Sequence, residues 1–109
     1  MPTLSKLIAR TTLTTTNTTV LYTVPASTTT VLTNIIVSNI TGTAATFNIT
    51  LPDSSGTQVA LATAVSVPAN SIASFDLKQV LGGSGTQTII GWASANSALT
   101  IHMSGVELS

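Results

Sequence analysis

The chain has 109 residues and no formal net charge, and only 6% of its residues are charged. Three Lys and Arg residues are too few to displace the counterions of a nucleic acid or to hold an anionic membrane, so neither partner is expected. With three acidic residues, one His and no Cys, the sequence predicts no enzyme, no cofactor, no metal site and no disulfide framework.

The composition instead suits one small β-rich domain. Hydrophobic residues make up 43% of the chain and aromatic residues 4%, so the core must be aliphatic. Ser and Thr together supply roughly a third of the residues. A free monomer with so few charges should be poorly soluble, which suggests that other subunits cover much of its surface. The alternative is that hydroxyl groups alone keep this surface hydrated.

The N-terminal segment, residues 1–17, is predicted to be an extended arm or first strand that precedes a β-sandwich domain at residues 18–109. The segment carries Lys6 and Arg10, followed by a Thr-rich run. No apolar stretch of about 7–15 residues follows these charges, so no signal peptide is expected. An extended Thr-rich segment can add a strand to the sheet edge of a neighbour. An ordinary first strand is the alternative.

Apolar and polar residues alternate with a period of two along nearly the whole remaining chain, as in Ala45-Thr46-Phe47-Asn48-Ile49. Turn residues such as Gly, Pro, Asn and Ser interrupt the alternation at short intervals. We expect about eight strands, near residues 4–14, 18–24, 29–40, 44–51, 57–66, 71–77, 86–94 and 98–107. The predicted fold class is all-β: a single antiparallel β-sandwich, jelly-roll-like, with an extended N-terminal arm.

Three segments depart from simple alternation. Residues 31–40 are apolar on both faces, which predicts a central strand. Residues 76–81 are compatible with one helical turn that groups Leu77, Val80 and Leu81. Gly91 suggests a bulge or a close backbone approach within its strand.

An internal similarity links Thr23-Val24-Pro25-Ala26-Ser27 with Ser66-Val67-Pro68-Ala69-Asn70. Pro lacks a backbone N–H and suits a point where a strand leaves a sheet. The two peptides are read as recurrent corners, with a duplication as the alternative.

The few residues able to support chemistry form no recognisable catalytic or ligand set. His102 stands between Thr100 and Ser104 on one strand face, and a Ser104–His102–Asp76 set carries no information in a chain so rich in serine. Asp53 is placed in a turn where it bonds backbone N–H groups, and Asp76 is read as structural. The glycine-rich segment 82–85 lacks the Lys of a phosphate-binding loop. Trp92 is expected in the core or at a subunit contact.

Residues 19–39, TVLYTVPASTTTVLTNIIVSN, and the Ala45-Thr46-Phe47 strand that follows resemble small virion proteins of tailed bacteriophages. The similarity covers about residues 19–51 well and the rest only in character. It implies a structural protein of the virion, assembled in the host cytoplasm. Such proteins occur as capsid decoration (cement) proteins, often trimeric, and as tail or fibre modules.

The leading hypothesis is therefore a capsid decoration protein that forms a homo-oligomer, with a trimer favoured, and binds the major capsid protein or another virion protein. A tail, neck or fibre module is the first alternative, and a carbohydrate-binding module that uses Trp92 is the second. The assembly interface is expected at Leu4, Lys6, Arg10 and Trp92. We also expect deletion of residues 1–16 to abolish attachment and leave the domain folded.

Overall fold

The computed structural model describes residues 3–53, 55–82 and 87–108, and these residues form eight β-strands and no helix. The all-β prediction is confirmed, and each expected strand lies within a few residues of an observed one. The strands are β1 (Thr3–Thr12), β2 (Val20–Thr23), β3 (Thr29–Asn39), β4 (Ala45–Pro52), β5 (Gln58–Val67), β6 (Ile72–Leu81), β7 (Thr88–Ala93) and β8 (Leu99–Leu108).

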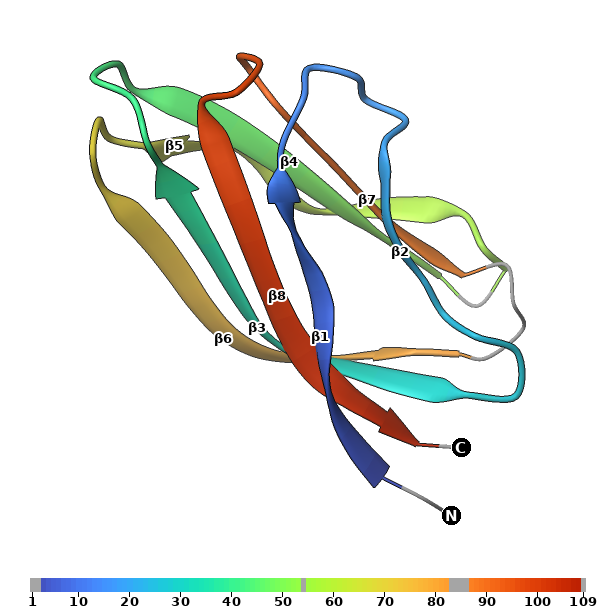
Figure 1. Cartoon of the computed structure of the whole chain (residues 1–109). Helices are drawn as coiled ribbons and strands as arrows, with labels where there is room; N and C mark the ends of the chain where they lie inside the picture. The colour runs from blue at the N-terminus through green and yellow to red at the C-terminus, as the bar shows by residue number, and fades with distance from the viewer. Residues whose placement is uncertain (1–2, 54, 83–86, 109) are drawn as a thin grey trace.

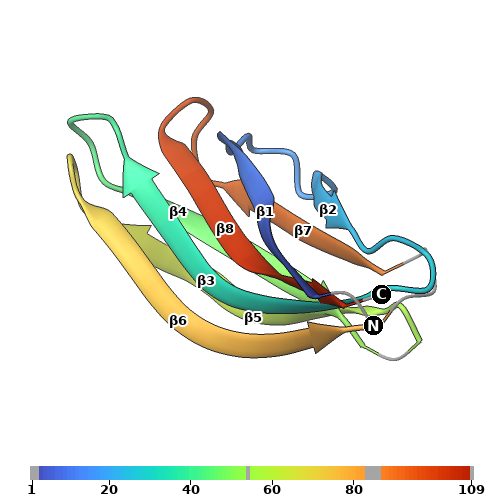
Figure 2. The same cartoon turned by 60° about the horizontal axis from the view of Figure 1, so that its bottom comes forward.

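The strands build two four-stranded antiparallel sheets that pack face to face (Figure 1). Sheet A has the order β1-β8-β3-β6, and sheet B has the order β2-β7-β4-β5. Eight strands in two such sheets form a jelly roll. The predicted central strand, β3, lies between β8 and β6 in sheet A. The order places the edge strands β1 and β2 along one side of the sandwich and β5 and β6 along the other (Figure 2).

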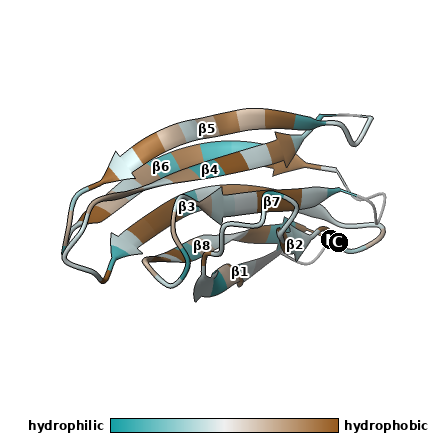
Figure 3. Ribbon diagram, turned by 90° about the horizontal axis from the view of Figure 1, so that it is seen from above, coloured by the Kyte–Doolittle hydropathy of each residue, from teal (hydrophilic) through white to brown (hydrophobic). Residues whose placement is uncertain are grey.

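The period-two alternation turns one face of each strand toward the space between the sheets. Figure 3 shows the resulting alternation of apolar and polar residues along the strands. The inner faces supply an aliphatic core around one large aromatic ring, that of Phe47. Its fully buried members include Leu13, Val24, Leu32, Ile35, Val37, Phe47, Ile49, Val67, Leu81, Ile89, Leu99, Ile101 and Met103.

The two similar peptides form equivalent corners between the sheets. Each leads from an edge strand of sheet B into sheet A, and Val24 and Val67 are both fully buried. Ser27 and Asn70, at matching positions, both adopt a left-handed backbone, with φ of 59° and 55°. The recurrent corner is therefore confirmed as a structural repeat.

The N-terminal segment pairs within its own chain. Residues Thr3–Thr12 form β1, which is antiparallel to β8 with a register shift between Leu7 and Ala9. The segment was expected either to add a strand to a neighbour's sheet or to form an ordinary first strand. The described residues form the ordinary first strand. Ile8 and Leu13 are buried in the core, so removing residues 1–16 would open the core. Our expectation that the domain survives this deletion is therefore wrong.

The expected helical turn at residues 76–81 is also wrong, because these residues continue strand β6. Leu77 and Leu81 face the core with the period of a strand, while Val80 faces outward and is exposed. Backbone pairing with β3 outweighs the weak helical grouping, since Val80 lies opposite Val31 and Leu81 lies opposite Thr30.

Candidate functional site

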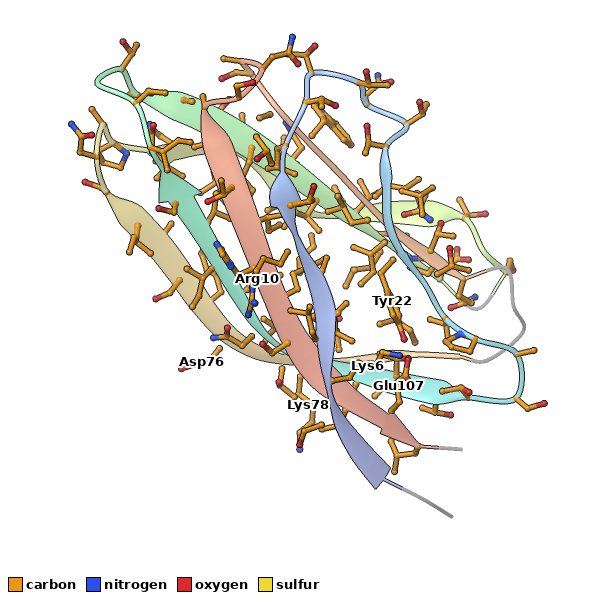
Figure 4. The ribbon with its side chains drawn as sticks, in the orientation of Figure 1. Lys6, Arg10, Tyr22, Asp76, Lys78 and Glu107 are labelled. Carbon is orange, nitrogen blue, oxygen red and sulfur yellow. The ribbon has the colours of Figure 1, made fainter. Side chains whose placement is uncertain are left out.

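A buried polar cluster closes one end of the sandwich and joins its two sheets. Glu107 of β8 points inward and is only 9% exposed. The Tyr22 hydroxyl, from β2 in sheet B, donates a hydrogen bond to Glu107 Oε2. Lys6 Nζ of β1 lies 3.4 Å from Glu107 Oε1, and Tyr22 Oη lies 2.8 Å from Thr30 Oγ1 of β3. Figure 4 shows Tyr22 extending toward Lys6 and Glu107.

Burial of the Tyr22 ring, reinforced by the hydrogen bond to Glu107, raises the pKa of Tyr22 from 10.0 to about 12. The phenol therefore stays protonated and keeps donating to the carboxylate up to alkaline pH. Because the Tyr22 proton goes to Glu107, the Thr30 hydroxyl donates to the phenol oxygen. The cluster satisfies its own polar groups, which is the arrangement of a structural clasp between the sheets. Sequence reasoning missed it.

The outer face of sheet A carries a second set of polar contacts. Arg10 Nε donates to His102 Nδ1 at 3.2 Å, and Asn34 Nδ2 donates to Asp76 Oδ1 at 3.2 Å. His102 is half-buried on this face, as the surface reading expected. Among the described residues its recorded side-chain partner is Arg10, so no Ser104–His102–Asp76 relay is assembled.

The remaining chemical candidates are structural or lie outside the described part. Asp53 Oδ1 accepts hydrogen bonds from the backbone N–H groups of Ser55 and Thr57, as expected of an Asp in a turn. Of the glycine-rich segment 82–85, only Gly82 lies within the described residues. In the ranges described, no group of three or more His, Asp or Glu side chains gathers as a metal site. The same ranges hold no helix with the length and apolarity to cross a membrane.

Trp92 lies on the outer face of sheet B. Its neighbours Gly91 and Ala93 face the core, and Trp92 is half-buried opposite Asn48 of β4. The core alternative for Trp92 is therefore wrong, and the contact alternative stays a prediction. At Gly91, expected to mark a bulge or a close backbone approach, an added Cβ would lie 2.8 Å from the side-chain atom Leu21 Cδ1 and 3.3 Å from the backbone oxygen of Asn48, so the nearest neighbour is a side chain.

The four residues predicted for the assembly interface do not form one patch. Lys6 is 44% exposed and pairs with Glu107 of the buried cluster, and Arg10 and Trp92 lie on opposite outer faces of the sandwich. Leu4 is opposite Glu107 in the register of β1 and β8, and its side chain is outside the described part of the structure.

An apolar cleft opens between the sheets on the side of β5 and β6. Its volume is about 390 Å³, and its walls include Phe47 and Ile49 from the core. Leu61 of β5 and Phe75 of β6 flank it and are partly exposed to solvent. The Phe47 and Phe75 rings are tilted by 58° with centroids 6.0 Å apart, a favourable aromatic geometry. The sequence signal for this side was the density of apolar residues in β5 and β6.

No protein-family model matches the chain, and no curated protein sequence matches it either. A chain in the structure of infectious bursal disease virus, Gx strain, is similar to 97% of it with a TM-score of 0.54 and 15% identity. The likeness is one of fold. Our chain spans 32% of that chain's length. Two further structures are less similar. For a chain of infectious bursal disease virus, Gt strain, the TM-score is 0.43 and the identity 10%, over 97% of this chain and 32% of that chain. For the tobacco streak virus coat protein dimer the TM-score is 0.42 and the identity 11%, over 99% of this chain and 84% of that chain.

Proposed function

We propose that the protein is a structural component of a virus particle, and specifically a decoration (cement) protein on the capsid of a tailed bacteriophage. One observation carries the proposal: the chain is a jelly roll that uses most of its few ionisable groups within its own fold and leaves apolar side chains of its edge strands exposed. The likeness in fold to a chain of infectious bursal disease virus and the resemblance of residues 19–51 to phage virion proteins support it.

A cement protein needs stiffness and repeated contacts, and the sandwich has features suited to both. Its strands pair residues that are far apart in the sequence, and the Tyr22–Glu107 clasp holds the two sheets together at one end. A homotrimer suits three-fold positions on a shell, where one kind of contact between neighbouring subunits repeats around the ring. We assign contacts with the major capsid protein or a neighbouring subunit to Leu4, Lys6, Arg10 and Trp92, in the assembled virion.

Labelling of intact virions with a gold-conjugated antibody against this protein tests the proposal. Gold distributed over the whole shell is the expected result. Gold confined to the tail, neck or fibres would replace decoration by the first alternative, a tail module with the same fold. A lack of labelling on both intact and disrupted virions would overturn the virion role itself.

A carbohydrate-binding module is the second candidate because Trp92 is half-exposed on an outer sheet face beside the Asn48 amide. Aromatic faces stack on sugar rings, and amides hydrogen-bond their hydroxyl groups. Asn48 Oδ1, however, accepts the backbone N–H of Ala64 at 3.0 Å, which occupies part of that amide. Glycan titration of the wild type and a Trp92→Ala variant separates this candidate from the structural role.

A further inference from the structure

Each of the two sheets ends in two edge strands, and these four edges differ in what they offer another chain. Unpaired edges template association, and proteins blunt them with short strands, bulges and charges. Strand β2 has only 4 residues. Strand β1 is interrupted by a register shift and carries Lys6 and Arg10. Strand β5 shifts register twice against β4, and Ala64 within it has a φ of 49°.

The fourth edge, β6, is long and exposes apolar side chains. It has 10 residues, none of them has a positive φ, and its register against β3 shifts once, between Leu32 and Asn34. Ile72 and Val80 are 67% and 66% exposed on its outer face. Phe75, on its inner face, is also exposed because the cleft leaves that side of the core uncovered. Strand β6 thus has the length and the exposed apolar side chains that would favour docking of another strand.

The charges on β6 indicate which strand that is. Asp76 and Lys78 are two residues apart, so both lie on the outer face, and Figure 4 shows them projecting away from the sandwich. If two copies of β6 pair antiparallel about Leu77, Asp76 of each copy lies opposite Lys78 of the other. Directly opposite residues have Cβ atoms about 4.5–5.5 Å apart, and opposite charges at that spacing attract. The edge is complementary to itself.

The edge at the other end of sheet A lacks this property. The described side chains of β1 include two cations, Lys6 and Arg10, and no anion. Two copies of β1 brought together would place charges of the same sign near each other, which destabilises a strand pair. The charge pattern therefore distinguishes the β6 edge from the β1 edge.

Pairing about Leu77 would also cover the apolar cleft. The inner faces of the two β6 strands would form one surface, with Leu77 opposite Leu77 of the copy and Phe75 opposite Gln79 of the copy. Phe75 and Leu77 line the cleft between the sheets, so the partner's strand would lie along its open side. Apolar area that the single sandwich leaves in water would become buried.

We infer that a second copy of this chain docks on β6, so that two sandwiches share an eight-stranded sheet across a two-fold axis at Leu77. The contact uses a different edge from β1 and is compatible with a trimer, which it would link to other trimers. The β6 contact does not depend on where the protein lies on a virion, and it can exist even if the proposed function is wrong.

Native mass spectrometry and light scattering of the purified full chain test the contact, with charge variants at both positions. Lys78→Asp makes the site wholly acidic, and Asp76→Lys makes it wholly basic, so each variant replaces two attractions with two repulsions. The double variant Asp76→Lys/Lys78→Asp exchanges the charges and restores complementarity. Circular dichroism checks that each variant is folded, since Asp76→Lys also removes the bond from Asn34.

The wild type is expected to contain an even number of chains, and each single variant is expected to have half that mass. Self-association should weaken at least about tenfold in the single variants, or about 1.4 kcal/mol, and recover in the double variant. Mixing the two single variants should restore pairing between unlike chains. Hydrogen exchange should show protection of residues 72–81 that is lost on dilution. A wild type with an odd number of chains, unchanged masses in the single variants, or a double variant that stays apart would overturn the inference.

Discussion

Replacing Tyr22 with Phe removes the hydroxyl that joins sheet B to the carboxylate of Glu107 in sheet A, and we expect a large loss of stability. Glu107 is almost fully buried, and the variant would leave it with Lys6 as its remaining recorded partner. Thr30, which is fully buried, would lose its bond to the phenol oxygen at the same time. The ring itself and its packing are retained, so the substitution isolates the hydroxyl.

Two magnitudes set the expected effect. A hydrogen bond to a charged group contributes about 1.5–3 kcal/mol, so the free energy of unfolding of Tyr22→Phe should fall by about 2 kcal/mol. For a domain of 109 residues that lowers Tm by about 9 °C. Lys6→Met is the matched variant on the other side of Glu107. Lys6 is 44% exposed, and exposed ion pairs contribute only about 0–1 kcal/mol, so this variant should cost less.

The raised pKa of Tyr22 gives the same clasp a signature in pH. The unfolded phenol loses its proton near its ordinary pKa of 10.0, while the folded phenol keeps it up to about 12. The stabilisation is therefore complete below pH 10 and is lost as the pH rises from 10 to 12. Tyr22→Phe lacks this loss, and the difference between the two proteins isolates Tyr22 because every other group is common to both.

Urea denaturation monitored by circular dichroism at pH 7, 10 and 12 measures both effects. Any of three results would refute the clasp. The free energy of unfolding of Tyr22→Phe could lie within about 0.5 kcal/mol of the wild type, or Lys6→Met could lose more stability than Tyr22→Phe. The stability of the wild type and of Tyr22→Phe could also change in parallel with pH.

Gly105→Ala should destabilise the fold by more than about 3 kcal/mol, because its Cβ would lie 2.3 Å from Val31 O, whereas Gly42→Ala, with nothing within 4 Å, should change Tm little. Ala64→Gly should raise the free energy of unfolding by up to about 1 kcal/mol, because Gly adopts the left-handed backbone of residue 64 without strain. Asn70→Gly should raise it less, because Asn tolerates that conformation. Chemical denaturation measures both changes. Trp92→Ala should keep the fold and weaken attachment to virions in a co-sedimentation assay, and loss of glycan binding with unchanged attachment would favour the carbohydrate alternative.

Much of the fold could be predicted from the sequence because its strands are locally consistent. The alternation along residues 45–51 and the apolar faces of residues 31–40 are local patterns, and the observed strands follow them. Strand order could not be predicted, because it depends on pairings such as that of Thr3 with Leu108, at opposite ends of the chain. The bulge in β5 could not be predicted either, because an alanine at position 64 gives no indication of a left-handed backbone.

The candidate site was less predictable than the fold. Lys6 and Arg10 were predicted as interface residues, but each has a partner within its own chain. Glu107 was overlooked because Tyr22 lies 85 residues away in sequence, and only the packing of the two sheets brings them together. Glu107 lies four residues after the buried Met103 and so on the same, inward face of β8, and this was the one local signal that it would be buried.

Quantitative mass spectrometry of purified virions tests the central claim most directly. If the protein is a structural component of the shell, its peptides should be present in every preparation at a fixed ratio to those of the major capsid protein. The same ratio should persist after gradient purification. Absence of these peptides from infectious, gradient-purified particles would contradict the account.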